Sequence, residues 1–381
     1  MKIGLNARFL CQPFTGIGQY TENLLLAMAK LDSHIKWVIV VPKKIPKSIQ
    51  LPKSITPIVL PEKKWKNASF RKFYWEQVQV PRLFKKEKVD LAHYPYPCNP
   101  RFSGHNAPQT IVTVHDSIPW TRPEYRRRIR TRLYQRNAKK ALEKADHIIC
   151  VSQSTAFTIS DHIKFPYSHI TVVHNAASPI FTKRTQKYRH AKPFFLYVGG
   201  YDERKNVIRL IEAFQEYIAP KYDIDLILVG AKNRTIKHYT ALDRLQKLIK
   251  SSKVKVPHQK IRGRIRTTSS LSAEKLAGYY RSTRGFVNVS LAEGFNIPLL
   301  EAATCEAPII TSDIPIHHEI IGKNGLFCDP YSTKNIGETL LNFLRDENLQ
   351  KSLIQNSKKL KKQYSWESSA QKTLELYKTF Y

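Results

Sequence analysis

Short runs of apolar residues alternate with longer segments of helical periodicity along the whole chain. Most of these runs are continuous, which is typical of parallel strands buried on both faces. The alternation predicts an α/β protein whose strands are joined by right-handed crossovers. The expected strands are Ile3–Asn6, Ile35–Val41, Val89–His93, Thr110–His115, His147–Ser152, Ile170–His174, Phe194–Val198, Asp225–Val229, Gly285–Ser290, Pro308–Thr311 and Leu326–Cys328.

A polar, basic stretch without apolar periodicity, residues 182–193, interrupts this pattern near its middle. The chain has 381 residues, the length of about two domains. We therefore expect two Rossmann-like domains, 1–185 and 186–363, that form a cleft between them. The remaining segment, 364–381, has the pattern of a capped final helix.

One segment, 290–302, combines a strand end, a Gly-Phe-Asn loop and a helix start. Glu293 lies at the strand end, and Glu301 follows eight positions later inside the expected helix. Pro298 stands near the helix start, where its missing N–H does no harm. Helix N-termini bind anions, and open α/β sheets bind ligands at the carboxyl ends of their strands. The segment therefore predicts a site for an anionic or phosphate-bearing ligand.

A second strand–loop–helix segment spans 194–217. Gly199 and Gly200 allow the backbone to approach a ligand closely. Arg204 suits bidentate contact with phosphate, and Lys205 adds a point charge. Because cations at a helix N-terminus oppose the helix dipole, these two require a compensating anion. In a sugar-nucleotide enzyme, they would stabilise the charge that develops on a departing diphosphate.

Two weaker signals lie in the first half of the chain. Gly16 and Gly18 follow the first expected strand and precede an expected helix at Tyr20–Lys30. His115, followed by Asp116, ends another strand. Taken alone, the glycines are compatible with a simple turn and the histidine with a structural role.

The pattern Glu-Gly-Phe-x-x-Pro-x-x-Glu-Ala, which contains Glu293 and Glu301, resembles the Glu-x7-Glu signature of retaining GT-B glycosyltransferases of family 4, group 1. This family includes many bacterial mannosyl- and glucosyltransferases. The segment around Arg204 and Lys205 is similar to the family's Gly-Gly/Arg-Lys-Asn element, and the resemblance extends from the first strand to Trp366. It implies a GT-B fold, with two Rossmann-like domains whose parallel sheets face a central cleft. It also implies that 364–381 crosses back to the N-terminal domain.

The resemblance assigns roles to these residues. Arg204 and Lys205 would hold the donor diphosphate, and the loop with Gly16 and Gly18 would close on it. His115 would lie near the donor sugar and the acceptor hydroxyl. A pKa near neutrality would suit this histidine for proton handling or hydrogen bonding. The second glutamate of the signature would bind the ribose. The first, with the loop amides, would bind the hexose, and the strand-end element at 263–265 would border the base. The expected catalytic residues are His115, Glu293, Arg204 and Lys205, and the expected donor-binding residues are Gly16, Gly18, Gly199, Gly200, Arg264, Ile265, Phe295, Asn296, Ile297 and Glu301.

The implied reaction is hexose transfer from a sugar nucleotide to a lipid-linked or membrane-presented glycan in surface polysaccharide biosynthesis, lipopolysaccharide included. No residue stands out as a covalent nucleophile, so the resemblance implies same-face attack assisted by the leaving phosphate. The Gly-Ile-Gly-Gln-Tyr start and the Glu-Gly-Phe-Asn loop look most like mannosyltransferases, which makes GDP-mannose the first expected donor. A catalytically inactive GT-B scaffold is an alternative, which the intact acidic and basic motifs oppose.

The sequence departs from the family pattern at two positions. Asn296 stands where many relatives have Gly. Asparagine tolerates a left-handed backbone, so the loop can form, while its side chain alters the sugar pocket. Ala176 follows Asn175 where many relatives have Asn-Gly, which changes only a turn.

No metal or other cofactor is expected. Asp223 and Asp225 form an Asp-x-Asp pair, but they introduce a strand, at the end of the sheet where ligands do not bind. We expect them to be structural. Arg204 and Lys205, together with helix dipoles, would neutralise the diphosphate without a divalent ion.

The charge of the chain is strongly unbalanced, with 63 Lys+Arg against 30 Asp+Glu and a formal net charge of +33. Such an excess implies an anionic partner. The densest stretch, Arg122–Lys144, alternates cations with apolar residues at helical spacing, which favours docking on an anionic membrane over a simply solvated helix. A nucleic-acid-binding protein is the alternative from another class, although no motif for specific nucleic-acid binding is present. Scattered, unpaired Cys residues, no signal-peptide pattern and no long apolar run favour a cytoplasmic enzyme, peripheral on the inner face of the cell membrane.

Overall fold

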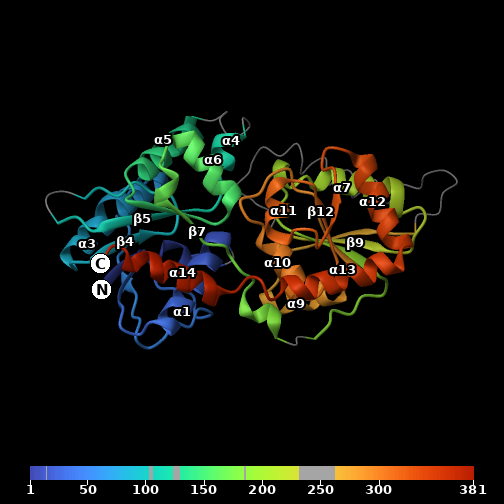
Figure 1. Cartoon of the computed structure of the whole chain (residues 1–381), viewed down its shortest axis with the longest axis horizontal. Coiled ribbons are helices and arrows are strands. Elements are labelled where there is room, and N and C mark those ends of the chain that lie inside the picture. Colours follow the sequence, from blue (N-terminus) through green and yellow to red (C-terminus); the bar gives the residue numbers. More distant parts are fainter. Residues whose placement is uncertain (14, 103–105, 123–128, 184–185, 231–261) are drawn as a thin grey trace. The chain divides into compact units, whose positions relative to one another are not determined.

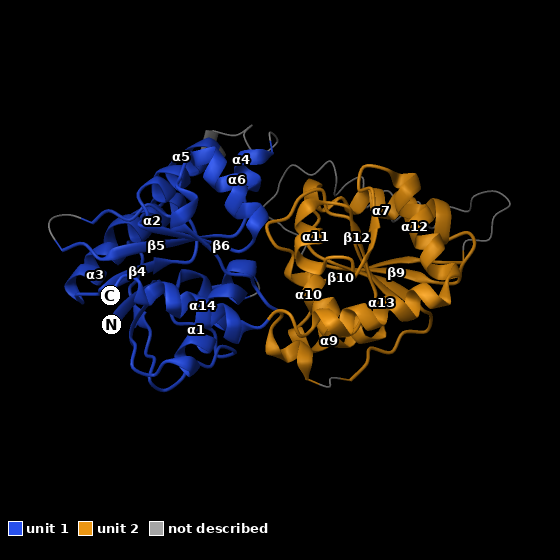
Figure 2. Cartoon of the chain, viewed as in Figure 1, with its two compact units in different colours: residues 1–176, 365–381 blue, residues 177–364 orange. Residues whose placement is uncertain are grey.

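The protein divides into two compact units. The structure, a computed structural model, describes the whole chain except residues 14, 103–105, 123–128, 184–185 and 231–261. The first unit contains Met1–Ala176 and Ser365–Tyr381, and the second contains Ala177–Tyr364 (Figure 2). In each unit, helices cover both faces of a central sheet (Figure 1).

The first unit is built on a parallel sheet of seven strands in its described part, in the order β3-β2-β1-β4-β5-β6-β7. Its strands are β1 (Lys2–Asn6), β2 (Lys36–Val41), β3 (Ile58–Val59), β4 (Leu91–Tyr94), β5 (Gln109–Val114), β6 (His147–Cys150) and β7 (Ile170–Val172). Its α-helices are α1 (Gly16–Leu31), α2 (Ala68–Tyr74), α3 (Val80–Lys86), α4 (Ile118–Thr121), α5 (Ile129–Glu143), α6 (Gln153–Ile163) and α14 (Trp366–Lys378). A π-helix, Trp75–Gln79, links α2 to α3.

The second unit has a parallel sheet of six described strands in the order β10-β9-β8-β11-β12-β13. These are β8 (Phe194–Val198), β9 (Asp225–Val229), β10 (Ile265–Thr268), β11 (Gly285–Asn288), β12 (Ile309–Ser312) and β13 (Leu326–Cys328). Its α-helices are α7 (Val207–Ala213), α9 (Ala273–Ser282), α10 (Ile297–Thr304), α11 (Pro315–Ile321), α12 (Thr333–Arg345) and α13 (Glu347–Leu360). A π-helix, Phe214–Ile218, continues α7.

Both sheets follow the doubly wound strand order of Rossmann folds, which confirms the predicted α/β class. The order reverses beside the first strand of each unit, between β1 and β4 and between β8 and β11. At such a switch point, the loops leave adjacent strands in opposite directions and open a crevice at the carboxyl edge of the sheet. Apart from Arg264 and Ile265, the expected site residues of the second unit follow β8 and β11, the two strands that flank this point.

Helix α14 packs in the first unit, although it follows the second unit in sequence. The Tyr377 hydroxyl lies 2.6 Å from Nδ1 of the buried His93 on β4, and the Ser369 hydroxyl donates to the His174 carbonyl at 2.6 Å. Trp366 packs edge-on against Tyr20 of α1. These contacts anchor the end of the chain to the core of the first sheet.

The boundary between the units falls after Ala176, earlier than the predicted division at 185/186. The reason is Phe181, which is buried against the ring of Tyr280 on α9. The Arg281 guanidinium also donates to the carbonyls of Phe181 and Lys183. The polar composition of 182–193 suggested a linker, but its first residues are held by α9.

Two differences from the predicted elements have simple causes. The helix expected at Tyr20–Lys30 begins at Gly16, because the Thr15 hydroxyl caps it by accepting from the Gly18 amide at 3.0 Å. Strand β10 was not predicted, because its Ile-Arg-Thr-Thr sequence lacks an apolar run. It lies at the edge of its sheet, where one side is open to solvent and polar residues are tolerated.

Candidate active site

The loop after β8 folds back over the end of its own strand. The Tyr197 hydroxyl donates to the Gly200 carbonyl at 2.6 Å, and a Cβ on Gly199 would lie only 2.8 Å from that hydroxyl oxygen. A side chain at Gly199 would therefore push this turn apart. The chain then forms a 3-10 turn, Glu203–Lys205, and Asn206 adopts a left-handed conformation with φ 57° before α7 begins.

Asn206 ties this turn to two other strand ends. Its amide donates to the Val289 carbonyl at 3.0 Å, just after β11, and to the Pro330 carbonyl at 2.7 Å, just after β13. The Leu291 amide in turn donates to the Arg204 carbonyl at 2.7 Å. The loops that follow β8 and β11 are thus fixed to each other at the switch point of the second sheet. Asn206 was not among the predicted site residues, although it directly follows the Arg-Lys pair.

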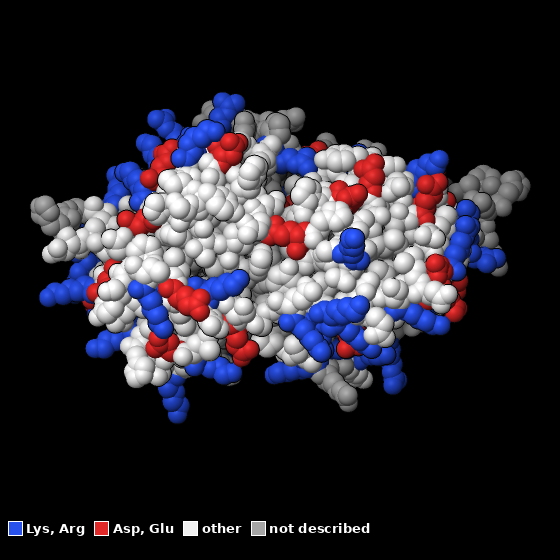
Figure 3. Space-filling model, in the orientation of Figure 1, with Lys and Arg blue, Asp and Glu red and all other residues white. Residues whose placement is uncertain are grey.

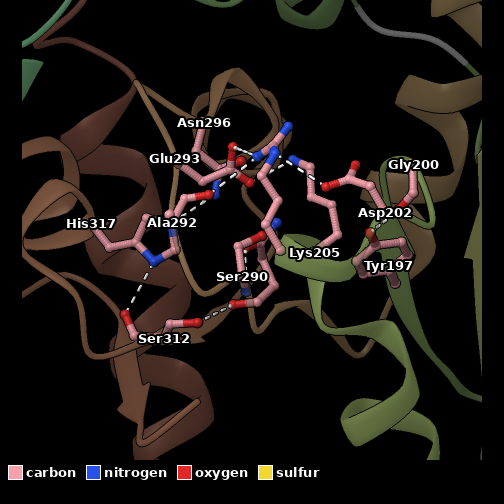
Figure 4. Close-up of polar contacts among 12 residues, drawn as sticks. Tyr197, Gly200, Asp202, Lys205, Ser290, Ala292, Glu293, Asn296, Ser312 and His317 are labelled. Carbon is pink, nitrogen blue, oxygen red and sulfur yellow. Dashed lines mark hydrogen bonds and ion pairs between the residues drawn. The ribbon is translucent and has the colours of Figure 1, made fainter. Parts of the chain in front are cut away.

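Glu293 lies between the two predicted phosphate-binding cations (Figure 4). Its Oε2 accepts from Arg204 Nη1 at 2.6 Å, and its Oε1 accepts from Lys205 Nζ at 2.5 Å. The carboxylate side chain is 7 % exposed and that of Lys205 11 %. Burial alone would raise the pKa of Glu293, but the charges of Lys205 and Arg204 outweigh it and lower the pKa to about 2. The carboxylate is the compensating anion that the helix-dipole argument required.

Asp202 completes this ionic cluster. Its Oδ1 lies 3.1 Å from Arg204 Nε, while Arg204 Nη1 also donates to the Ala292 carbonyl at 3.1 Å. Groups from both loops therefore fix the orientation of the Arg204 guanidinium. Asp202 was not predicted, because a carboxylate repels phosphate and the sequence alone gave no reason to place one in a phosphate site.

The Gly-Phe-Asn loop leads directly into α10. Asn296 has φ 77°, so the left-handed conformation expected for this departure from Gly is confirmed. Its side chain makes no capping bond to the helix, and its Nδ2 lies 2.8 Å from Nε2 of His317 on α11. Phe295 is buried against Tyr364, and Ile297 begins the helix.

Glu301 lies inside α10 and is almost completely buried. Its Oε2 accepts from the Tyr280 hydroxyl of α9 at 3.0 Å. Burial raises its pKa to about 7, against the smaller opposite effect of this hydrogen bond. The two glutamates therefore have different environments. Glu293 is an ionised carboxylate paired with cations, whereas Glu301 has a pKa close to physiological pH.

In the first unit, the two glycines of the first motif lie within the first turn of α1. A Cβ on Gly18 would lie 2.3 Å from the Gln12 carbonyl oxygen, so this position requires glycine. Around Gly16 there is open space: among the described residues, no atom lies within 4 Å of the position that a Cβ would take. A free approach to backbone amides at a helix N-terminus is the geometry that anions favour.

His115 follows β5 in the first unit, and its Nε2 lies 2.8 Å from the Pro95 carbonyl. A carbonyl only accepts, so Nε2 carries the hydrogen and Nδ1 is an acceptor. Burial lowers the pKa to about 4, more than this bond raises it. The expectation of a pKa near neutrality is therefore wrong: the ring is a neutral hydrogen-bonding group at physiological pH.

Arg264 and Ile265 were expected at a strand end, as part of the element that borders the base. They stand where β10 begins, and the Arg264 amide donates to Asp225 Oδ1 at 2.9 Å. This is the amino edge of a parallel sheet, away from the ends of β8 and β11. The residues that leave β10 at the carboxyl edge are Thr268 and Ser269, whose polar sequence gave no such signal.

Asp225 has the structural role that was expected. Its Oδ2 accepts from Arg266 Nε at 2.8 Å and lies 2.9 Å from His190 Nε2. Asp223 pairs with Lys192 at 2.5 Å. Burial would raise the pKa of Asp225, but its hydrogen bonds, with Arg266 first, lower it.

The basic segment Arg122–Lys144 is described only in part. Arg126, Arg127 and Arg128 lie outside the described residues. Helix α5 is confirmed at Ile129–Glu143. Its apolar positions Ala138, Ala141 and Leu142 are buried in the core of the first unit, while Leu133 and Tyr134 are 62 % and 46 % exposed. Figure 3 shows Lys and Arg side chains gathered over this part of the unit, and the described exposed cations are Arg132, Arg136, Lys139, Lys140 and Lys144. No helix in the described ranges is long and apolar enough to cross a membrane.

Comparisons with known proteins agree with this picture along the whole chain. The family model described as "Glycosyltransferase Family 4" matches residues 14–179, and the model described as "Glycosyl transferases group 1" matches residues 181–360. The O-antigen chain mannosyltransferase B of Escherichia coli is 28 % identical over 284 residues, which cover 72 % of this chain and 71 % of that protein.

A longer relative, the serotype-specific mannosyltransferase WbdA of Escherichia coli, is 24 % identical over 292 residues. The match covers 71 % of this chain but 35 % of WbdA, so this chain spans about a third of the length of WbdA. Among solved structures, the sucrose-phosphate synthase of Thermosynechococcus elongatus aligns with a TM-score of 0.76 at 19 % identity, covering 100 % of this chain and 98 % of that one. At this identity, the likeness concerns the fold.

Two parallel α/β units of Rossmann strand order give this chain the GT-B fold. The two family matches, which together run from residue 14 to residue 360, give the identity more closely. The chain belongs to the group 1 and family 4 glycosyltransferases, as the Glu-x7-Glu pattern predicted.

Proposed function

We propose that this glycosyltransferase moves a hexose, with retention of configuration, from a sugar nucleotide to a lipid-linked or membrane-presented glycan. Mannose from GDP-mannose is the first donor to consider, because two of its relatives are named mannosyltransferases. The name of the first includes the O-antigen chain, which supports an acceptor of the surface polysaccharide class. The observation that carries the proposal is the Arg204–Glu293–Lys205 cluster.

The cluster suits a ligand whose charge changes during the reaction. Two cations from the loop after β8 would bind the donor diphosphate and stabilise the charge that forms as the sugar departs. Glu293 would then be free to accept from hexose hydroxyls. The cluster is already ordered by the bonds of Asn206 and Leu291, so little reorganisation is required when the donor binds.

The nucleoside would be held by α10 and its carboxylate. Glu301 would accept from the ribose hydroxyls, a contact that favours its ionised form. Asn296 provides no side-chain cap to α10, and the Ile297 amide at the start of this helix would donate to a hexose or phosphate oxygen. No divalent ion is assigned to this arrangement.

The first unit would contribute backbone amides and a neutral imidazole. The first turn of α1, opened by Gly16 and Gly18, suits a phosphate group. His115 would act through Nδ1 as a hydrogen-bond acceptor for a sugar or acceptor hydroxyl. Same-face attack, in which the leaving phosphate takes the acceptor proton, requires no titrating histidine.

The test is a panel of sugar nucleotides that includes GDP-mannose, UDP-glucose and UDP-galactose, scored by thermal shift and by slow donor hydrolysis. We expect one donor to stabilise the protein and to be hydrolysed. The Arg204→Gln/Lys205→Gln variant should lose both signals, whereas Lys334→Gln, which removes an exposed charge that pairs with Glu338, should keep them. Failure of every sugar nucleotide and every nucleoside diphosphate to bind would contradict the proposal.

A further inference from the structure

A chain of buried hydrogen bonds lies behind the Gly-Phe-Asn loop, and it begins at the end of β11. The Thr311 hydroxyl on β12 donates to the Asn288 carbonyl at 3.0 Å. The same hydroxyl oxygen lies 2.8 Å from His317 Nδ1. The Ser312 carbonyl oxygen lies 3.1 Å from that nitrogen (Figure 4). His317 is 0 % exposed, so its ring nitrogens depend on these protein groups.

The positions of the hydrogens follow from this arrangement. The Thr311 hydroxyl has used its single hydrogen on Asn288, so towards His317 it is an acceptor. The Ser312 carbonyl is an acceptor as well. Nδ1 of His317 therefore carries a hydrogen. Burial lowers the pKa of His317 to about 4, which keeps the ring neutral at physiological pH. Nε2 of His317 therefore carries a lone pair and can only accept a hydrogen bond.

That lone pair determines the orientation of Asn296. The amide nitrogen, not the oxygen, must face Nε2, as the 2.8 Å contact has it. The amide oxygen is directed elsewhere. Asn296 is 6 % exposed, and Oδ1 is buried without a hydrogen-bond partner among the described residues. A buried acceptor without a partner is unusual in a folded protein and marks a position where a ligand donor can bind.

Charged groups of the ionic cluster lie close to this relay. Glu293 and Lys205 both act electrostatically on the His317 ring, and Asn296 is three positions from Glu293 on the same short loop. The unpartnered oxygen therefore belongs to the neighbourhood in which the hexose is expected. A glycine at this position would offer no side chain, so the contact depends on the Asn296 amide.

We propose that Asn296 Oδ1 accepts a hydrogen bond from one hydroxyl of the donor hexose, and that His317 is the positioning residue that fixes the amide in this orientation. The inference rests on the proposed function. It specifies the pocket more closely: at this point the sugar must present a hydroxyl that donates. A group that only accepts, or none, is disfavoured there.

The test compares deoxy and deoxyfluoro analogues of the preferred donor, because carbon-bound fluorine cannot donate a hydrogen bond. Calorimetry should show that wild-type protein loses affinity by about two- to tenfold, the worth of a neutral hydrogen bond, when one particular hydroxyl is replaced by either H or F. In Asn296→Gly this loss should disappear at that hydroxyl and persist at the others. Glycine adopts φ 77° without strain, so the loop should keep its form.

The affinity for the nucleoside diphosphate alone separates the possible outcomes. It should be the same in wild type and in Asn296→Gly, because the contact concerns the sugar. If Asn296→Gly retains every penalty of the wild type, or if it weakens the diphosphate equally, the inference is overturned and the proposed function stands. If the wild type binds neither sugar nucleotides nor diphosphates, both are overturned.

His317→Phe tests the positioning role. Without the lone pair, the amide can reverse, so the fluoro analogue should bind as well as the hydroxyl donor while the diphosphate affinity stays unchanged. The matched control is His318→Gln, because the adjacent histidine is half exposed and pairs with Asp313 outside the relay. Discrimination that persists in His317→Phe with normal diphosphate binding would remove His317 from the proposal.

Discussion

At Glu293, one carboxylate is shared between two cations, so an anion that binds Arg204 or Lys205 must compete with it. The pairing with Glu293 also stabilises the two cations, which are largely shielded from solvent, when no donor is bound. Under the proposed function, the carboxylate would have two successive partners: the cations first, then the sugar. Because the cations carry charge, their bonds to Glu293 are stronger than neutral hydrogen bonds.

We predict that Glu293→Gln binds nucleoside diphosphates more tightly than the wild type while transferring sugar more slowly. Removing the competing charge should raise the affinity for GDP or UDP by about fivefold or more, the scale of one charge-assisted hydrogen bond. Calorimetry with both nucleotides measures this directly, with Glu338→Gln, an exposed residue of α12, as the control. Equal or weaker binding by Glu293→Gln would show that the carboxylate does not compete for the cations.

Glu301 provides a prediction about pH. Its pKa of about 7 in the folded protein lies above the value of about 4.3 expected in the unfolded chain. The folded state therefore binds the proton more tightly, and this group costs stability progressively as the pH rises from about 4.3 to about 7, after which the cost stays constant. Glu301→Gln mimics the protonated form and should remove this dependence.

Urea unfolding at pH 5 and pH 8 is the measurement. The stability of Glu301→Gln relative to wild type should increase between these values by roughly 2 kcal/mol, because the folded carboxyl ionises over this range. Glu338→Gln should show little change. A difference between Glu301→Gln and wild type that is the same at both pH values would contradict the burial-raised pKa. At pH 8, the same variant should bind nucleotide more weakly, since an amide is a poorer acceptor for two ribose hydroxyls.

At the scale of elements, strands with an uninterrupted apolar run were predictable, and the polar edge strand β10 was not. The expected β8, β9 and β13 agree with the structure at both ends, because an uninterrupted apolar run has only one favourable place in a doubly wound sheet. Half of the side chains of the edge strand β10 are exposed, so its sequence has no uninterrupted apolar run. That omission also made Arg264 look like a residue at a strand end, although it stands at a strand start.

Under the proposed function, the turn Glu203–Lys205 and the start of α10 would together provide the positive charge for the leaving diphosphate, and this predicts how the enzyme depends on metal ions. Two fixed cations and a helix N-terminus with no side-chain cap can perform the neutralisation that a divalent ion performs elsewhere. We predict that turnover with the preferred donor survives excess EDTA with less than about a twofold change, below the loss that one missing phosphate contact would cause. Complete loss in EDTA that Mg²⁺ or Mn²⁺ restores would reverse this prediction.

At the scale of the whole molecule, the topology of the sheet explains which residues of the candidate active site could be predicted from the sequence. Glu293, Arg204 and Lys205 follow strands on either side of a switch point, where doubly wound folds bind ligands, so local motifs sufficed to find them. Asn296 and His317 meet because β12 and α11 bring the chain back beside the loop, across 21 positions. No local spacing encodes such a return, and neither the buried relay nor the orientation of the amide could be predicted.

The charge of +33 is the other property of the whole chain that needs an explanation, and the sequence offered membrane lipid or nucleic acid. The structure narrows how lipid docking could occur. The apolar face of α5 is occupied by the core of its unit, so the helix does not insert along its length; what it presents outward is cationic, with Leu133 and Tyr134 exposed among the charges. Docking through this face would therefore be mainly electrostatic, and we predict that it fails at high salt.

The measurement is co-sedimentation with neutral and anionic liposomes. Each cation near an anionic surface contributes about 1 kcal/mol, so replacing Arg132, Arg136, Lys139 and Lys140 together by Gln should weaken binding on the order of a thousandfold. The matched control removes the same charge from exposed lysines elsewhere in the first unit: Lys43, Lys44, Lys47 and Lys53. If the two quadruple variants lose affinity equally, the attraction belongs to net charge and not to α5. If the wild type ignores anionic vesicles but binds RNA or DNA with steep salt dependence, the charge serves nucleic acid instead, because neutralised phosphates release counterions in proportion to the contacts made.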